Sequence, residues 1–120
     1  MSHTDLPYVI INAMPDSSHI AILVTASSEE EARKIADNLL ARRKAACVSI
    51  VPGISSFFWW QDKRDSAQEH MLIIKTKRSL LDDVIKLVKE LHSYQVPEIL
   101  ALPVVGGNPD YLEWLEKEVR

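Results

Sequence analysis

The sequence predicts an α+β domain built from two strand–helix–strand blocks and a final helix. Short apolar runs alternate with segments of helical period, which is the first indication. The second is a weak internal repeat, because His19 and Thr25 bracket one apolar run as His70 and Thr76 bracket another at the same spacing. The third is size and composition. A chain of 120 residues, 47% hydrophobic and 26% charged, is long enough for one buried core and too apolar for general disorder.

The first block follows a segment that differs in composition. Residues 1–18 mix turn formers with one short apolar patch and are predicted to form a loosely ordered N-terminal arm, ahead of a single domain at residues 19–120. Ile20–Thr25 predicts a strand buried on both faces. Two overlapping Ser-x-x-Glu patterns within residues 27–31 each fit a capping box, and apolar residues then recur along one helical face. Ala46–Val51 predicts a second strand, ended by the Pro-Gly pair that follows.

The second block begins with an aromatic strand. It runs from about Ser55 to Gln61, residues 62–67 are polar and turn-like, and Met71–Thr76 predicts a fourth strand. Ser79 is expected to cap the second helix. The apolar face of that helix would be formed by Leu80, Leu81, Val84, Leu87, Val88 and Leu91.

The C-terminal part supplies one more strand and one more helix. Ile99–Val105 predicts the strand, and Asp110–Arg120 a short helix for which Asn108 can serve as the cap. The order is that of the ferredoxin-like βαββαβ sandwich with an extra C-terminal helix. Right-handed crossovers place both middle helices on one face of the sheet, so the opposite face must be polar or covered by something else.

The aromatic strand indicates self-association. Phe57 and Trp59 alternate with Phe58 and Trp60, so both of its faces are apolar. Leaving two large aromatic side chains in water would forfeit several kcal/mol, at about 25 cal/mol per Å² of apolar surface. We therefore expect Phe57, Phe58, Trp59 and Trp60 to form an interface between subunits.

Composition excludes several classes of protein. Cys47 is the only cysteine, so an intrachain disulfide and zinc sites with several thiolates are ruled out, and its role stays open between a buried small hydrophobe and a reactive thiol. A net charge of −3 argues against nucleic-acid binding. The sequence shows neither a secretory leader nor an apolar run of membrane-spanning length, which predicts a cytoplasmic protein. No catalytic motif is present, so we expect no enzyme.

Several short motifs resemble the CutA family, the divalent-cation tolerance proteins, over roughly Ile20 to the C-terminus. They are Ala45–Val48, Ile50–Ile54, the aromatic strand, Glu69 with Ile74–Thr76, His92–Ile99 and Tyr111–Trp114. The resemblance implies a compact homotrimer of ferredoxin-like subunits related to the PII signalling proteins, with strands paired and clefts formed between subunits. It also implies tolerance of copper and other divalent cations by binding or regulation. The alternative is a trimeric structural or signalling module that presents a surface or small-molecule cleft to a partner protein.

The sequence departs from the family pattern at positions that bear on function. The family usually has Tyr at Phe58, Gly at Asp62 and Pro at Ser93. Some bacterial members offer copper one Cys and two adjacent His, where this chain has Val24, Leu91 and His92. Of these positions only His92 retains a ligand, so His92 is the candidate residue for copper or another divalent cation.

A cleft between subunits is the second candidate site. Lys75 interrupts an apolar strand, and its ammonium group would either pair with Glu69 or Glu98 or contact an anion in a cleft. One cationic group among aromatic side chains near a helix end is a common arrangement in small-molecule sites. The residues expected to line this cleft, for a small anion or metabolite, are Trp60, Glu69, Lys75, Tyr94, Glu98 and Trp114.

Overall fold

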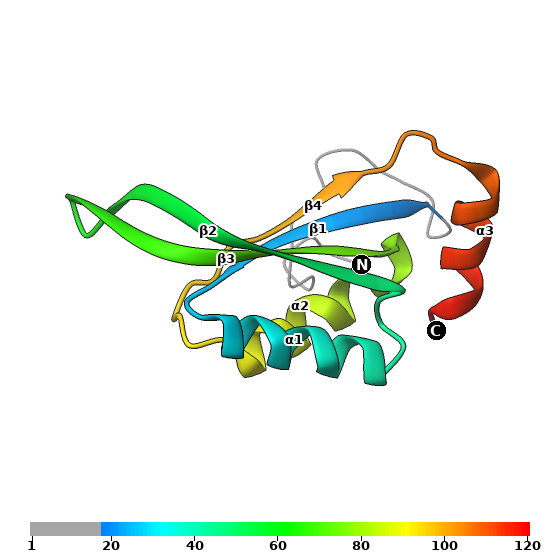
Figure 1. Cartoon of the computed structure of the whole chain (residues 1–120), viewed down its shortest axis with the longest axis horizontal. Helices are drawn as coiled ribbons and strands as arrows, with labels where there is room; N and C mark the ends of the chain where they lie inside the picture. Colours follow the sequence, from blue (N-terminus) through cyan, green and yellow to red (C-terminus); the bar gives the residue numbers. More distant parts are fainter. Residues whose placement is uncertain (1–17) are drawn as a thin grey trace, which may run out of the picture.

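The chain folds as one antiparallel sheet with two helices on one face and a third helix at its end (Figure 1). The computed structural model describes residues 18–120, so the predicted arm lies outside the described residues apart from Ser18. The strands lie in the order β2-β3-β1-β4, which confirms the predicted fold class. The elements are β1 His19–Ala26, α1 Glu29–Ala41, β2 Cys47–Trp60, β3 Lys63–Lys77, the 3-10 turn η2 Arg78–Leu80, α2 Leu81–Leu91, β4 Ile99–Pro103 and α3 Pro109–Glu118.

The core lies between α1, α2 and the sheet face beneath them. Ile20, Ile22 and Val24 of β1 are fully buried there, together with Leu72 and Ile74 of β3. The helices contribute the apolar stripes that the sequence pattern predicts, with Ala32, Ile35, Ala36, Leu39, Val84, Leu87 and Val88. This packing fixes the face on which each strand residue lies, because alternate residues of a strand point to opposite sides.

The helix starts confirm two predicted caps and correct a third. The Ser28 hydroxyl accepts the Glu31 amide at 3.1 Å, so the second of the two capping patterns starts α1. Ser79 does not cap α2. It lies inside η2, where the chain is already coiled, and α2 begins at Leu81 without a side-chain cap. Asn108 caps α3 as predicted, its side-chain oxygen accepting the Asp110 amide at 3.1 Å.

The second and third predicted strands are in fact one strand, β2. Gly53 adopts a φ of 71°, and the register with β3 shifts between Val51 and Ile54, so the Pro-Gly pair forms a bulge instead of ending the strand. A proline is tolerated there because β2 lies at the edge of the sheet.

The predicted turn at residues 62–67 is mostly strand. β3 begins at Lys63, and the turn is confined to Gln61 and Asp62, both with positive φ, as a two-residue hairpin requires. The β2–β3 hairpin projects beyond the rest of the molecule (Figure 1). Its polar residues belong to a strand that is exposed to water, so their composition is the same as that of a turn.

The sheet face opposite the helices is uncovered by the described residues. In β1 Ala21 and Leu23 are only half-buried, so the prediction of a strand buried on both faces is wrong for this single chain. We call this surface the open sheet face. Its apolar members are Ala21, Leu23, Val51, Met71, Ile73, Leu100 and Leu102, placed together by the strand register.

The last strand and helix differ slightly from the predicted ranges. β4 ends at Pro103, and Val105, which was expected to belong to it, is exposed outside the sheet. α3 begins one residue earlier than predicted and is tied to the body at its end, where the Arg43 guanidinium and the Glu118 carboxylate are 2.7 Å apart.

Candidate functional site

A cavity of about 710 Å³ lies between the β2–β3 hairpin and the segment that joins α2 to β4. We call it the side cavity. Register explains part of its lining: Ile54 pairs with Glu69 and Phe58 with Asp65, so beyond the bulge these side chains share one strand face with Trp60. Its lining residues are Thr25, Ser56, Phe57, Phe58, Trp60, Asp65, Glu69, Ser93, Tyr94, Gln95, Val96 and Glu98.

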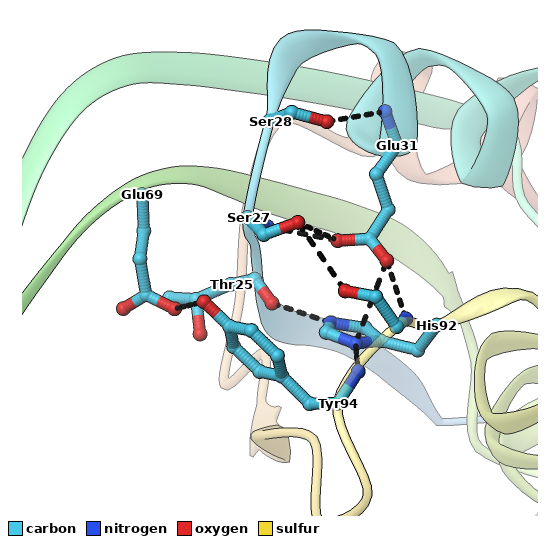
Figure 2. A network of polar contacts seen from close by, with 8 residues as sticks. Thr25, Ser27, Ser28, Glu31, Glu69, His92 and Tyr94 are labelled. Carbon is cyan, nitrogen blue, oxygen red and sulfur yellow. Dashed lines mark hydrogen bonds and ion pairs between the residues drawn. The ribbon is translucent and has the colours of Figure 1, made fainter.

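Glu69 and Tyr94 join the two walls of the side cavity. The Tyr94 hydroxyl donates to Glu69 Oε2 at 3.0 Å, as Figure 2 shows. Burial raises the pKa of Tyr94 to about 12, and the hydrogen bond and negative charge of Glu69 act in the same direction. Tyr94 is therefore protonated at neutral pH and acts as a donor to the carboxylate. Glu69 itself is only 5% exposed.

His92 is held in one orientation behind this pair (Figure 2). Its side chain is fully buried, and Nε2 lies 2.7 Å from the Thr25 carbonyl oxygen while Nδ1 lies 3.0 Å from the Tyr94 amide nitrogen. An amide can only donate and a carbonyl can only accept, so in these two hydrogen bonds Nδ1 is the acceptor and Nε2 is the donor. Both ring nitrogens are engaged, and a metal ion could bind His92 only by displacing one of these partners.

Glu31 ties the start of α1 to the end of α2. Its carboxylate accepts from the Ser27 amide at 2.8 Å, the Ser27 hydroxyl at 2.9 Å and the Ser93 amide. Burial alone would raise the pKa of Glu31, but these hydrogen bonds from Ser27 and Ser93 outweigh it and hold the pKa below the ordinary 4.5. This network positions the segment that carries His92 and Tyr94.

The structure brings together four of the six residues predicted for a cleft. Trp60, Glu69, Tyr94 and Glu98 line the side cavity, whereas Lys75 and Trp114 do not line it. Trp114 lies on α3, against the ring of Tyr111 at 5.5 Å between centroids.

Lys75 forms neither of the ion pairs considered for it within the described residues. It alternates with the buried Ile74 and so lies on the open sheet face. There its ammonium nitrogen is 3.1 Å from Ser49 Oγ and 3.6 Å from Cys47 Sγ, and Cys47 is half-buried.

Asp65 is the acidic lining residue that sequence reasoning missed. It lies in the segment interpreted as a turn, although its spacing from Glu69 would place both on one face of a strand. The four aromatic residues predicted for an interface also lie on this hairpin, with Phe57 81% and Trp59 72% exposed.

A metal centre is not preassembled in the part of the chain that the structure describes. No group of three or more His, Cys, Asp or Glu side chains there is arranged to hold a metal ion. In the same part, no helix is both long and apolar enough to cross a membrane.

Fold and site together define a small ferredoxin-like protein with an open sheet face and an acidic, aromatic side cavity. The CutA1 divalent ion tolerance protein family model matches residues 20–118. The chain belongs to this family, whose members are non-catalytic tolerance proteins, in agreement with the prediction that it is not an enzyme.

Individual relatives agree with this assignment. The chain is 46% identical over 101 residues to Protein CutA 1, chloroplastic, of Oryza sativa, and the match covers 84% of this chain but only 57% of that longer protein. It is 47% identical over 96 residues to the divalent-cation tolerance protein CutA of Thermus thermophilus, covering 80% and 93% of the two chains. The solved Thermus structure superposes with a TM-score of 0.84 at 44% identity, over 85% of this chain and 99% of that one.

Proposed function

We propose that the chain is a homotrimeric divalent-cation tolerance protein that acts by binding or regulation. The observation that carries the trimer is the open sheet face. Leu100 and Leu102 are exposed beside the half-buried Leu23 and Ile73. On the projecting hairpin the same strand face carries the exposed Phe58 and Trp60. Apolar surface of this extent is typical of a surface that another protein molecule covers.

A ring of three copies suits this shape. The hairpin extends past the body of the subunit, so it can reach the open sheet face of a neighbour (Figure 1). Such a head-to-tail contact closes into a ring when the rotation between neighbours is one third of a turn. The relation to the trimeric PII proteins, implied by the family resemblance, supports three copies.

Sedimentation equilibrium of the full chain tests the trimer. We expect a mass three times the 13.6 kDa of one chain, unchanged on dilution through the micromolar range. A 13.6 kDa species at high concentration would contradict the proposal, because the open sheet face would then be exposed in a stable monomer.

Copper or another divalent cation is the proposed ligand, with His92 as the candidate donor. Because His92 Nδ1 accepts the Tyr94 amide, metal binding must release that bond and should perturb the segment carrying Tyr94. Imidazole nitrogen is a suitable ligand for copper, so a histidine fits the proposed role. The hydrogen bonds of the His92 ring to the Thr25 carbonyl and the Tyr94 amide compete with metal binding.

A copper titration of the full chain tests the role of His92. We expect saturable binding that is lost in His92→Gln and retained in the matched control His70→Gln. Paramagnetic broadening of the His92 ring resonances in the unmodified protein provides a second readout that does not depend on a variant folding. Copper binding that is unaffected in His92→Gln, without broadening of these resonances, would assign the metal to another group.

The alternative function is a trimeric structural or signalling module that presents a surface or a small-molecule cleft to a partner protein. The side cavity is the observation that favours it. A cytoplasmic location remains a prediction from the sequence, and cell fractionation tests it. Among the relatives, the rice protein is named as chloroplastic and the Archaeoglobus fulgidus protein as periplasmic.

A further inference from the structure

We propose that the end of α3 covers a site for a multivalent phosphate-type anion and acts as the internal, autoinhibitory ligand of that site. Four basic side chains form the site, which we call the basic strip: His19 at the start of β1, Lys77 at the end of β3, and Arg43 and Lys44 in the loop between α1 and β2. The strip lies at the end of the sheet opposite the projecting hairpin (Figure 1). Its contacts with α3 lie within one chain, so they do not depend on what covers the open sheet face.

Glu116 of α3 lies between two of these basic side chains. Its carboxylate is 3.1 Å from His19 Nε2 and 3.6 Å from Lys77 Nζ. His19 and Lys77 are directly opposite each other in the β1–β3 register, where two like charges are unfavourable. His19 Nε2 is buried and has no hydrogen-bond partner among the described residues. The Glu116 carboxylate therefore supplies the negative charge that this pair of basic residues requires.

The last residues of the chain are held by Arg43 and Lys44. The Arg43 guanidinium is 2.7 Å from Glu118 Oε2, and the Arg43 carbonyl oxygen accepts the Arg120 amide at 2.9 Å. The Lys44 ammonium group donates to the Arg120 carbonyl oxygen at 2.9 Å. Arg43 follows α1 with a left-handed φ of 59°, at a position where glycine or asparagine is usual. Its contacts with the end of α3 give a reason for an arginine there.

The end of α3 supplies most of the negative charge that the strip faces. Apart from the pairs with Glu116 and Glu118, the strip forms one ion pair within the described residues, between Lys44 and Asp83 of α2 at 3.2 Å. Displacing the end of α3 would leave Lys77 and Arg43 without an anionic partner among these residues. The strip would then attract an anion.

The end of α3 can move without opening the core. Residues 105–108, which join β4 to α3, are exposed. Leu115 and Val119 are buried where α3 meets the body, but neither belongs to the main hydrophobic cluster. The Arg43–Glu118 pair joins partly exposed side chains, and such pairs contribute little to stability and are weakened by salt. A ligand with more negative charge can therefore compete with α3 for the strip.

The arrangement of the groups on α3 indicates the class of ligand. Two carboxylates and one backbone carbonyl, on residues 116, 118 and 120, occupy successive parts of the strip. A ligand that replaces all three needs several anionic oxygens along a chain, as in tripolyphosphate. Guanidinium and ammonium groups both bind phosphate oxygens, the first through two parallel hydrogen bonds and the second as a point charge. A single orthophosphate can reach only one part of the strip.

Calorimetric titration of the full chain with tripolyphosphate, at constant ionic strength, tests the proposal. The double variant Glu116→Gln/Glu118→Gln keeps the size of both side chains and removes the charges that cover the strip. We expect it to bind tripolyphosphate at least about tenfold more tightly than the unmodified protein does, because the anion no longer competes with two carboxylates. Equal affinity in the two proteins, or no binding by either, would overturn the inference.

Asp110→Asn/Glu113→Gln is the matched control. Both residues are exposed on α3, and Glu113 is 3.0 Å from Lys117 of the same helix. This control changes the net charge by the same amount and should keep the affinity for tripolyphosphate within about twofold of the unmodified protein. If the control gains as much affinity as Glu116→Gln/Glu118→Gln does, net charge alone explains the gain and the inference is wrong.

A third substitution assigns the binding to the strip. Arg43→Gln, added to Glu116→Gln/Glu118→Gln, should weaken tripolyphosphate binding about tenfold, whereas Lys117→Gln added to the same variant should not. Orthophosphate should bind Glu116→Gln/Glu118→Gln at least about tenfold more weakly than tripolyphosphate does. Equal effects of the two added substitutions would place the anion elsewhere, and equal binding of the two phosphates would exclude a multivalent ligand.

Hydrogen exchange of the unmodified protein provides a test that needs no variant to fold. Raising the salt concentration from about 0.05 M to about 0.5 M screens the ion pairs and should speed exchange of the amides of residues 116–120 at least about threefold more than that of β1 and β3. An equal change in all three segments would mean that charge does not hold α3, and would overturn the inference. Sedimentation reports the trimer and copper titration reports cation binding, so failure of the proposed function is distinguishable from failure of this site.

Discussion

Removing the Glu31 carboxylate should destabilise the protein, because this group joins two segments that are distant in the sequence. The side chain is only 10% exposed and accepts three hydrogen bonds, from the amide and hydroxyl of Ser27 and from the amide of Ser93. Hydrogen bonds to a charged group contribute about 1.5 kcal/mol or more each. Because the Ser27 groups can turn toward water, we expect Glu31→Ala to lower the free energy of unfolding by about 3 kcal/mol. Glu31→Gln, which keeps one acceptor oxygen, should lose about half as much.

The contribution of Glu31 should also depend on pH. Its pKa is lowered in the folded protein, so the folded state binds this proton less readily than the unfolded state does. The stabilisation is therefore complete above the ordinary pKa of 4.5 and is lost as the pH falls through the lower folded pKa. The difference between the unmodified protein and Glu31→Gln should be constant near neutral pH and shrink below pH 4.5.

Urea unfolding followed by tryptophan fluorescence measures both effects. All proteins are compared at one concentration, because self-association would otherwise change the apparent stability. Glu30→Ala is the matched control, since Glu30 is exposed in the same first turn of α1 and shares the interaction with the helix dipole. If Glu31→Ala costs no more than Glu30→Ala, or if its effect persists unchanged in acid, the network does not stabilise the fold as argued.

Three further changes test other parts of the molecule. Trp59→Lys should weaken self-association at least about hundredfold in sedimentation, because a side chain that is 72% exposed in one chain would be buried between copies. Leu40→Lys on the outer face of α1 is the control. If the two variants sediment with equal masses, Trp59 is not part of the interface. Thr76→Val removes the hydroxyl that donates to the Lys44 carbonyl at 2.6 Å and should cost about 1–2 kcal/mol in urea unfolding, a loss that would be absent if water replaced the hydroxyl. In Gly53→Ala the added Cβ would have no atom within 4 Å, so only the φ of 71° opposes the substitution. We expect the free energy of unfolding to fall by about 1–2 kcal/mol in the same assay. An unchanged free energy of unfolding would mean that the bulge relaxes.

The errors in the predicted strands share one physical cause. Whether a Pro-Gly pair ends a strand or forms a bulge depends on the neighbouring strand, and β3 continues along β2 on both sides of Gly53. A segment of polar residues such as the one around Asp65 has the composition expected of a turn and also that of a solvent-exposed hairpin strand. Local sequence therefore could not distinguish one long hairpin from two shorter strands and a loop.

For the candidate site, too, the sequence predicted some features and contacts between distant residues decided the others. Trp60, Glu69, Tyr94 and Glu98 could be named from the sequence because they stand in the motifs that resemble the CutA family, whereas Asp65 was missed. Which of them meet depends on how the hairpin and the segment after α2 lie against each other. Lys75 was grouped with them because a charge that interrupts an apolar strand could pair with an acid such as Glu69. Only the register places its side chain beside Cys47 and Ser49, on the same strand face as Glu69 but farther along β3.

The sequence by itself determined the fold class, the two helices that cover one sheet face, and an apolar surface larger than one chain can cover. Each of these follows from periodicity and composition, which act over a few residues. Only the tertiary structure decided that His92 has both ring nitrogens engaged and that the side cavity is acidic. The physical reason is that hydrogen-bond partners and the net charge of a cavity depend on contacts between residues far apart in the chain.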